Sequence, residues 1–357
     1  MKYLIIVLLL LVIVAVVIFV QRKRNTNSHI VFVPQGLSDA RVASLNLKQQ
    51  SDSSLGILDE RRIKFPVKQK GETDDYRGVP ELEWIVDIIP DKGFLFNKNE
   101  FLKIFDYNWR TDFESQFYAY FPSTQRWSFA IAGDSPEQFD SLELAVSLAP
   151  VFGNEEDLTV ERLQKYLIEL QKRLGAFSGR FHVTPRETPE SAVKRSKTLR
   201  ALQKELNSDV IIVLRSNSRF RSDQFWNTLT DLGLKWGDGD LFHWTNYESG
   251  VGDDNFFSVW TSTEPGYFLP EDVANGTMNP EDLIFGFSIP RSPDPNNVFE
   301  IVVESVEYCQ SKLGGTIVDE NGSPFDKEKC RAKIRQIISK MNESGFDQGQ
   351  GLILRLI

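Results

Sequence analysis

The stretch DLIFGFSIPRSPDPNNVFEIVVESVEYCQSKLGGTIVDENGSPFDKEK, residues 282–329, predicts a strand, a helix, a second strand, a turn and a further helix. The first strand covers Leu283–Ile289, where side chains alternate between two faces. One alternation is wholly apolar: Phe285, Phe287 and Ile289. The other is only partly apolar: Ile284, Gly286 and Ser288. One face of this strand therefore requires a core, and the other does not.

A helix is predicted over Asn297–Leu313, because apolar residues recur there at helical spacing. These residues are Val298, Ile301, Val302, Val306 and Cys309. Asn296 or Asn297 can cap the start of the helix, and Gly314 suits the position after its end. A short strand, Thr316–Asp319, follows.

The region before residue 208 repeats this succession of elements at a spacing of about 127 residues. Trp84–Ile89 stands where Val210–Leu214 stands, and helix Val160–Leu174 ends at a glycine as helix Val298–Leu313 does. Two further pairs of strands correspond: Phe117–Phe121 with Leu241–Thr245, and Trp127–Ile131 with Phe256–Thr261. The pattern predicts two tandem copies of one domain, the first diverged. The alternative is that any two α+β domains share such a skeleton.

The predicted fold class is α+β, with two split βαβ domains that each pack helices on one face of an antiparallel sheet. In the second copy we expect four side chains to point toward the helices: Phe257, Val259, Phe285 and Phe287. The alternation then turns another set toward the open face: Ser258, Trp260, Ser262, Ile284 and Gly286, together with Leu241, His243 and Arg215. This open face is where we expect binding.

The residues from 209 to about 341 carry a series of short matches whose order and spacing are specific. These are Val210-Ile211-Ile212, Trp236-Gly237-Asp238, Phe257-Ser258-Val259, Pro265-Gly266, Ile289-Pro290 and Leu313-Gly314-Gly315 with Val318-Asp319. Through them the region resembles the C-terminal domain of ZipA, a family of bacterial cell-division proteins that bind FtsZ. A membrane anchor, a linker and then this domain is also the layout of that family.

The resemblance implies a shallow groove on the open face, which holds the short C-terminal tail of FtsZ. The groove positions it implies are Arg215, Leu241, Trp260, Ser262, Glu264 and Gly286, to which the alternation adds His243 and Ile284. Several of these residues make the groove more polar than is usual in the family. Trp260 is the expected anchor, since aromatic residues dominate binding energy at such sites. The alternative is a tryptophan that only covers the sheet.

A membrane span is predicted at residues 3–20, which are uncharged and almost wholly aliphatic. A helix of this length just crosses a hydrocarbon core of about 30 Å. Arg22-Lys23-Arg24 follow the span and only Lys2 precedes it, which favours a single pass of the bacterial inner membrane with the remaining domains in the cytoplasm. A cleaved export signal is the alternative, although no small-x-small cleavage site follows.

Four segments are thus predicted: an anchor with its basic flank at 1–24, a flexible linker at 25–80, a diverged copy of the domain at 81–208 and the FtsZ-binding copy at 209–357. The linker lacks a sustained periodic pattern and is rich in Ser, Gln and Asn. A flexible chain of about 55 residues has an r.m.s. reach of roughly 40 Å.

The sequence offers no pattern for catalysis, so neither an enzyme nor a cofactor, metal site or small-molecule substrate is expected. His29, His182 and His243 lie in different segments. Cys309 and Cys330 are expected to be two reduced, mostly buried thiols in a cytosolic domain. With a net charge of −9 and no basic stripe beyond residues 22–24, nucleic acid is not an expected partner.

Two functions are compatible with these features. The first is a membrane-anchored cell-division adaptor that binds the FtsZ tail and tethers FtsZ polymers, the Z-ring, to the membrane for septation. The second is a structural envelope scaffold that uses its paired domains for homotypic or other protein contacts. The adaptor requires a peptide site around Trp260, whereas the scaffold requires a large flat interface.

Overall fold

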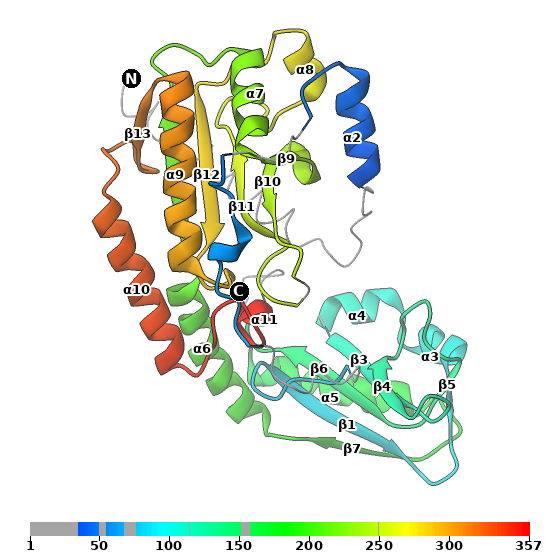
Figure 1. Ribbon diagram of the computed structural model, residues 1–357. Coiled ribbons are helices and arrows are strands. Elements are labelled where there is room, and N and C mark those ends of the chain that lie inside the picture. Colours follow the sequence, from blue (N-terminus) through cyan, green and yellow to red (C-terminus); the bar gives the residue numbers. More distant parts are fainter. Residues whose placement is uncertain (1–34, 50–54, 68–75, 114, 151–157, 249) are drawn as a thin grey trace, which may run out of the picture. The chain divides into compact units, whose positions relative to one another are not determined.

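The computed structural model describes residues 35–49, 55–67, 76–113, 115–150, 158–248 and 250–357. The chain divides into two compact units (Figure 1). The C-terminal unit contains Leu206–Arg355 and Ile357, together with the described residues that precede Lys68. The middle unit contains the described residues of Lys68–Glu205 and Leu356.

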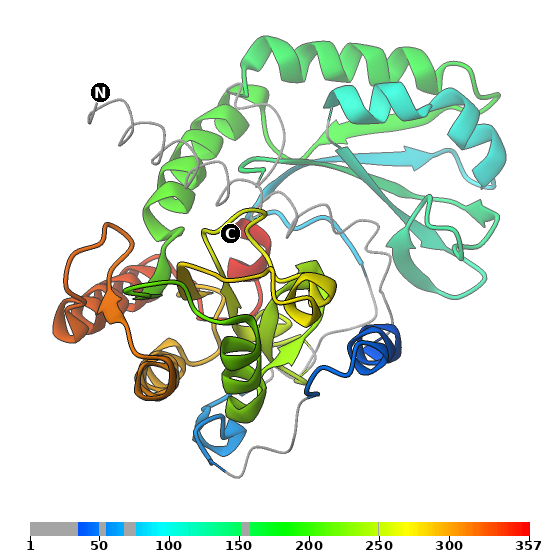
Figure 2. The same ribbon diagram turned by 90° about the horizontal axis from the view of Figure 1, so that it is seen from above.

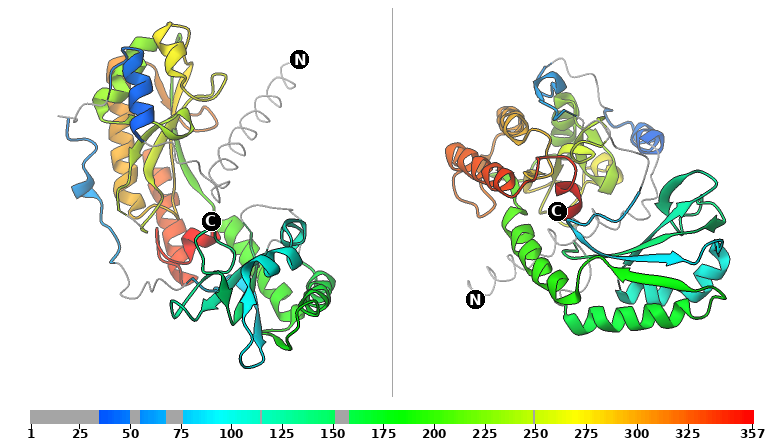
Figure 3. Two further views of the ribbon diagram at one scale, coloured as in Figure 1. Left: turned by 90° about the vertical axis from the view of Figure 1, so that its right-hand side faces the viewer. Right: turned by 90° about the horizontal axis from the view of Figure 1, so that it is seen from below.

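The C-terminal unit is built on a six-stranded sheet in the order β13-β8-β12-β11-β10-β9, with every neighbouring pair antiparallel. Its strands are β8 (Asp209–Arg215), β9 (Lys235–Trp236), β10 (Phe242–Thr245), β11 (Asn255–Trp260), β12 (Asp282–Ser288) and β13 (Thr316–Val318). Its helices are α7 (Ser222–Leu232), the 3-10 turn η2 (Asp238–Asp240), α8 (Pro270–Ala274), α9 (Pro295–Leu313) and α10 (Lys327–Glu343), and α11 (Ile353–Leu356) ends the chain. Helices α7 and α9 pack together, and α9 lies against the central strands (Figures 1 and 3).

The core of this unit lies between the sheet and α7 and α9, as the alternation predicted. Phe242 of β10 pairs with Val259, and its ring centroid is 4.8 Å from that of Trp226 on α7. Phe285 pairs with Val259 in turn, so these residues share the face toward the helices. The four predicted core residues are all buried: Phe257, Val259, Phe285 and Phe287. This part of the prediction is confirmed.

Helix α9 begins earlier than the sequence suggested. Its cap is Asp294, whose carboxylate accepts a hydrogen bond from the Asn297 amide at 3.3 Å, and neither Asn296 nor Asn297 caps it. The reason is Pro295, which has no N–H to satisfy and whose fixed φ suits the first helical position. The helix ends at Gly314, where φ is 72°, as predicted.

The middle unit contains a five-stranded antiparallel sheet in the order β4-β3-β6-β1-β7, and a small separate sheet of β2 and β5. Its strands are β1 (Glu83–Pro90), β2 (Phe96–Asn97), β3 (Ser115–Phe121), β4 (Arg126–Phe129), β5 (Gln138–Phe139), β6 (Leu142–Ser147) and β7 (Phe181–Pro185). Its helices are α3 (Lys98–Ile104), α4 (Tyr107–Phe113), α5 (Val160–Leu174) and α6 (Pro189–Leu206). Figure 2 shows α3 and α5 on one side of this sheet.

A cluster of phenylalanines forms much of the core of the middle unit. Phe96 is fully buried at its centre, and its ring centroid lies 5.1–6.1 Å from those of five other phenylalanines. The five are Phe94, Phe101, Phe139, Phe177 and Phe181. They come from β5, β7, α3 and the connecting loops, so Phe96 of β2 links most elements at this end of the unit.

The two units agree in their central strands but not throughout. In the middle unit β1 lies between β7 and β6, just as β8 lies between β13 and β12 in the C-terminal unit. The first hairpin strand, β3, then adjoins β6, whereas in the C-terminal unit it is the second hairpin strand, β11, that adjoins β12. The predicted superposition of the two sheets is therefore wrong for these strands, because alternation identifies a strand without specifying its neighbour. A common origin of the two units stays a prediction.

The prediction of a flexible linker at residues 25–80 is wrong for three stretches, the first of which contains α2 (Gln35–Ser44). Arg41 on this helix donates to both carboxylate oxygens of Glu271, at 2.8 and 2.7 Å, and lies 5.2 Å from the ring centroid of Trp236. The Trp226 indole donates to the Lys48 carbonyl at 2.9 Å. These contacts join the stretch to the C-terminal unit.

A second stretch, which includes the 3-10 turn η1 (Glu60–Arg62), contacts α9. Arg62 donates to both carboxylate oxygens of Glu304 at 2.7 Å, and the Lys64 amide donates to Asp294 at 2.9 Å. The rings of Phe65 and Phe256 are 6.0 Å apart. A few basic and apolar residues are enough to attach this stretch, because each contacts a residue of the folded unit. The polar composition of the surrounding sequence gives no sign of these contacts. The third stretch, Tyr76–Val79, belongs to the middle unit.

The predicted membrane span at residues 3–20 lies outside the described residues. Among the helices that the structure does describe, none combines the length and the apolar character needed to cross a bilayer. The anchor therefore stays a prediction from the sequence.

Candidate functional site

The candidate site is the outer face of the C-terminal unit, by which we mean the side of its sheet opposite α7 and α9. Strand register assigns residues to this face, since directly paired residues point the same way. One row contains His243, Ser258, Gly286 and Ile211, and the next contains Trp260, Ile284 and Val213. Ile211 and Val213 were not predicted as residues of this face, although they lie four and two positions before Arg215 in the same strand and therefore point the same way.

Trp260 lies over Gly286 and is buried, with only 8% of its surface exposed. A side-chain carbon placed on Gly286 would come within 2.5 Å of the indole and 2.9 Å of the end of Ile211. The indole thus occupies the space that any other residue at 286 would fill. The expectation of an exposed Trp260 is wrong, because the missing side chain at Gly286 leaves room for the indole against β12.

His243 is buried, and both of its ring nitrogens are engaged. Nε2 lies 2.7 Å from the Asp238 carbonyl, which can only accept, so Nε2 carries a proton. Nδ1 lies 2.9 Å from the Ser258 hydroxyl, which donates to it when the ring is neutral. His243 therefore ties β10 to β11 and to the turn η2, and its role in the outer face is to fix the strands.

The polar groove residues gather around Asp282 at the end of β12. Its carboxylate accepts from the Ser262 amide at 2.7 Å, from the Ser262 hydroxyl, and from Thr261 at 3.0 Å. Asp282 also pairs in register with Arg215, whose exposed guanidinium lies beside the turn at Gly322. Asp282 was not predicted as a site residue, and it holds Ser262 in place.

The two remaining predicted groove residues lie outside the strands. Leu241 is half-buried and immediately precedes β10. A side-chain carbon placed on Gly239 would lie 3.6 Å from it. Glu264 lies in the exposed loop after β11. The structure therefore brings together Arg215, His243, Trp260, Ile284 and Gly286 on the outer face, with Ser262 at its edge, and leaves Glu264 beyond it.

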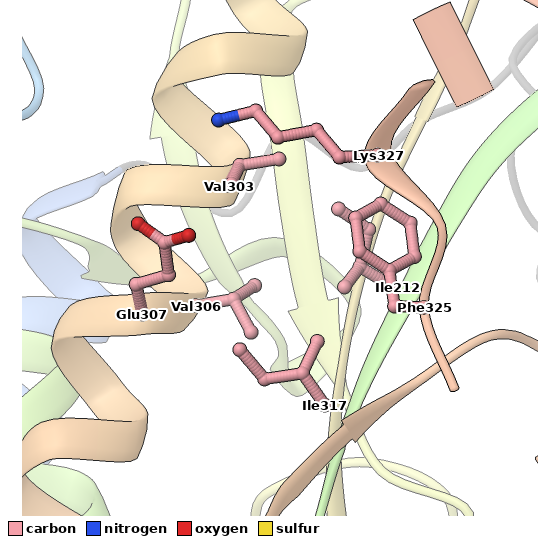
Figure 4. A pocket seen from close by; sticks show the side chains of 7 residues that line it. All are labelled: Ile212, Val303, Val306, Glu307, Ile317, Phe325 and Lys327. Carbon is pink, nitrogen blue, oxygen red and sulfur yellow. The ribbon is translucent and has the colours of Figure 1, made fainter. Parts of the chain in front are cut away.

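A pocket of about 200 Å³ lies on the opposite, helix side of the sheet (Figure 4). Its lining consists of Ile212, Val303, Val306, Glu307, Ile317, Phe325 and Lys327. The lining is mainly apolar, with one carboxylate and one ammonium group, and it includes none of the predicted groove residues. The pocket and the outer face are therefore different features of this unit.

The described residues contain no group of His, Cys, Asp and Glu that could hold a metal ion. Cys309 and Cys330 are both free, as predicted. Burial raises the pKa of the Cys330 thiol to about 11, and it raises the pKa of Cys309 further. Neither is a nucleophile at neutral pH, because the thiolate is the reactive form.

We expect Gly286→Ala to destabilise the C-terminal unit by about 1–3 kcal/mol, the usual cost of overpacking, because the added methyl group displaces the Trp260 indole. Gly237→Ala is the matched control, since a carbon added at Gly237 meets no atom within 4 Å. Thermal and denaturant melts of both variants give the measurement. Equal melting behaviour of the two would contradict the packing described for Trp260.

Residues 209–336 match the family model of the ZipA C-terminal FtsZ-binding domain. Among curated relatives, a cell division protein ZipA of Marinobacter nauticus is 29% identical over 162 residues, which are 44% of this chain and 47% of the relative. The ZipA of Pseudomonas syringae pv. syringae is 24% identical over 176 residues, 49% of this chain and 59% of the relative. That of Aliivibrio fischeri is 28% identical over 135 residues, 35% and 40% respectively. The chain spans about half the length of the curated relatives it matches.

Proposed function

Because residues 209–336 belong to the family of ZipA C-terminal FtsZ-binding domains, we propose that the C-terminal unit binds FtsZ and takes its C-terminal tail on the outer face. The unit then acts in cell division as a protein-binding adaptor and not as an enzyme. The family match at these residues is the observation that carries the proposal.

The surface of the outer face supports a peptide ligand. The contact between Trp260 and Gly286 forms its floor, and the half-buried side chains of Ile211 and Ile284 flank it. Arg215 and Ser262 supply a polar edge. An apolar floor with a polar rim is the usual arrangement of a protein-binding site. Because Trp260 is buried, the exposed edges of Ile211 and Ile284 take part of the anchoring role that was expected of Trp260.

We further propose that residues 3–20 anchor the protein in the bacterial inner membrane and that it tethers FtsZ polymers there. The support is the uncharged aliphatic stretch itself and the basic flank at residues 22–24. The domains would lie in the cytoplasm, where FtsZ polymers form.

The variant Ile284→Glu should weaken binding of a synthetic FtsZ tail peptide at least tenfold, about 1.4 kcal/mol, because it places a charge on the apolar floor. Its side chain is only half-buried on the outer face, so the fold should persist. Isothermal calorimetry on the full chain in detergent gives the affinity. Ile168→Glu, at an exposed position of α5 in the middle unit, is the matched control and should bind normally.

The same variants test the tether with FtsZ polymers and liposomes that carry the full chain. Wild type should bring FtsZ into the liposome pellet, whereas Ile284→Glu and a chain without residues 1–24 should not. If the tail peptide gives no binding heat with wild type, the adaptor proposal fails. Self-association of the full chain in the same preparation would then favour the scaffold.

A further inference from the structure

The middle unit also has a sheet face opposite its helices, and a segment of the chain lies across it. Ile85, Tyr118 and Ala145 form a buried apolar cluster on this face, and Trp127 and Phe129 pack against them. These residues alternate with Trp84 and Phe117, which point toward the helix side, where Trp84 meets Tyr166 of α5 and Phe117 meets Phe101 of α3.

The covering segment is Tyr76–Val79, which we call the strap. Its Tyr76 amide donates to the Trp127 carbonyl at 3.1 Å, and the Tyr76 ring lies 5.3 Å from that of Phe129. The Arg77 guanidinium lies 4.3 Å from the ring centroid of Trp127. The strap therefore contacts the sheet both through its backbone and through the consecutive side chains of Tyr76 and Arg77, as a bound peptide can.

Gly78 allows the strap to lie directly on the sheet. A side-chain carbon placed on Gly78 would come within 2.8 Å of Ile85 and 3.5 Å of Ala145, so a larger residue could not approach this closely. The Gly78 amide donates to Glu143 Oε2 at 3.0 Å. Gly78 therefore fixes both the depth and the register of the strap.

Glu143 is the polar centre of the contact, and it is fully buried in the middle of β6. Arg186, the residue after β7, binds Glu143 with its Nη2 2.5 Å from Oε1. Arg186 also binds both carboxylate oxygens of Asp87. Arg77 of the strap adds Nε at 2.9 Å from Oε1 and a second contact through Nη2.

The charges of the face are complementary to those of the strap. In the ion-pair cluster around Glu143, the face supplies two carboxylates, Glu143 and Asp87, and one guanidinium, Arg186. A third carboxylate of this face, Glu83, accepts a hydrogen bond from the Val79 amide of the strap. One positive charge is missing, and Arg77 supplies it. A buried carboxylate is costly unless it is paired, and it contributes specificity more readily than stability. The arrangement therefore selects a cation beside an aromatic residue and a glycine.

We propose that this face of the middle unit is a binding site for an extended peptide with an aromatic residue, a basic residue and a glycine in succession, and that the chain's own Tyr76-Arg77-Gly78 occupies it. An incoming peptide of this chemistry must displace the strap. The site is separate from the outer face of the C-terminal unit and does not depend on FtsZ.

The test uses the purified full chain and a fluorescent peptide with the sequence DDYRGVP of residues 74–80, followed by fluorescence anisotropy. Tyr76→Ala with Arg77→Ala removes the side chains of the strap and leaves the face intact. This variant should bind the peptide at least tenfold more tightly than wild type, where the strap competes. Adding Glu143→Gln, or replacing the peptide's Arg by Gln, should reduce this binding at least tenfold.

A strap variant that is folded by circular dichroism but binds the peptide no better than wild type would overturn the proposal. Hydrogen exchange on wild type gives a second, independent measurement in case the variant does not fold. Excess free peptide should accelerate exchange of the Gly78 amide, because it displaces the strap from Glu143. A peptide with Glu in place of Arg should not, and equal exchange with both peptides would also overturn the proposal.

Discussion

Phe96→Ala should lower the free energy of unfolding of the middle unit by about 3–5 kcal/mol, the range for a fully buried phenylalanine. Five other rings surround Phe96 and come from two strands, one helix and two loops. They cannot all move inward to fill the space, so a cavity remains. Denaturant melts followed by circular dichroism give the measurement.

Leu95→Ala is the matched control for this prediction. Leu95 is the preceding residue and 44% of its surface is exposed, so its truncation should change stability by about 0.5 kcal/mol or less. A similar loss in both variants would mean that the packing around the small sheet of β2 and β5 is not what holds this end of the unit together.

Trp260→Ala should lower the stability of the C-terminal unit by about 3 kcal/mol, at the lower end of the range for buried aromatic residues. The indole covers Gly286 and Ile211, and its removal leaves the backbone of β12 uncovered. FtsZ binding should weaken as well, because the floor of the outer face is lost. Melting and calorimetric titration of the same protein separate the two effects.

Tyr247→Ala is the control for Trp260→Ala, as it removes an aromatic side chain that is 65% exposed in the same unit. Its stability should stay within about 0.5 kcal/mol of wild type. If Trp260→Ala melts at the wild-type temperature and loses only binding, then Trp260 is an exposed anchor in solution, contrary to its burial here.

The positions of the strands and the long helices could be predicted because the periodicity of apolar residues is a local property of the sequence. Alternation in β12 identified Phe285 and Phe287 as core, and the glycine after α9 marked its end. Alternation in β11 likewise assigned Trp260 to the outer face, but it did not predict that Trp260 is buried. Burial depends on Gly286 of the neighbouring strand, and strand pairing is not visible in one strand's pattern.

Neighbour relations also explain the other errors. The hairpin order in the middle unit depends on which hairpin strand pairs with β6, and the alternation of side chains does not identify that strand. In the linker, isolated residues such as Arg41, Arg62 and Arg77 make the decisive contacts. A single arginine in a polar stretch has no periodic signal, and its carboxylate partner lies far away in the sequence.

The docking of α2 limits how far the C-terminal unit can stand from a bilayer. Only residues 21–34 separate the predicted span from Gln35, where α2 begins. A chain of this length extends to about 50 Å at most. Because α2 is attached to the unit, the part of the predicted linker that follows α2 does not increase this distance. A protein anchored at residues 3–20 would thus keep α2 within about 50 Å of the lipid, together with the unit to which α2 is attached, and FtsZ tails near the membrane would meet that unit at a high local concentration.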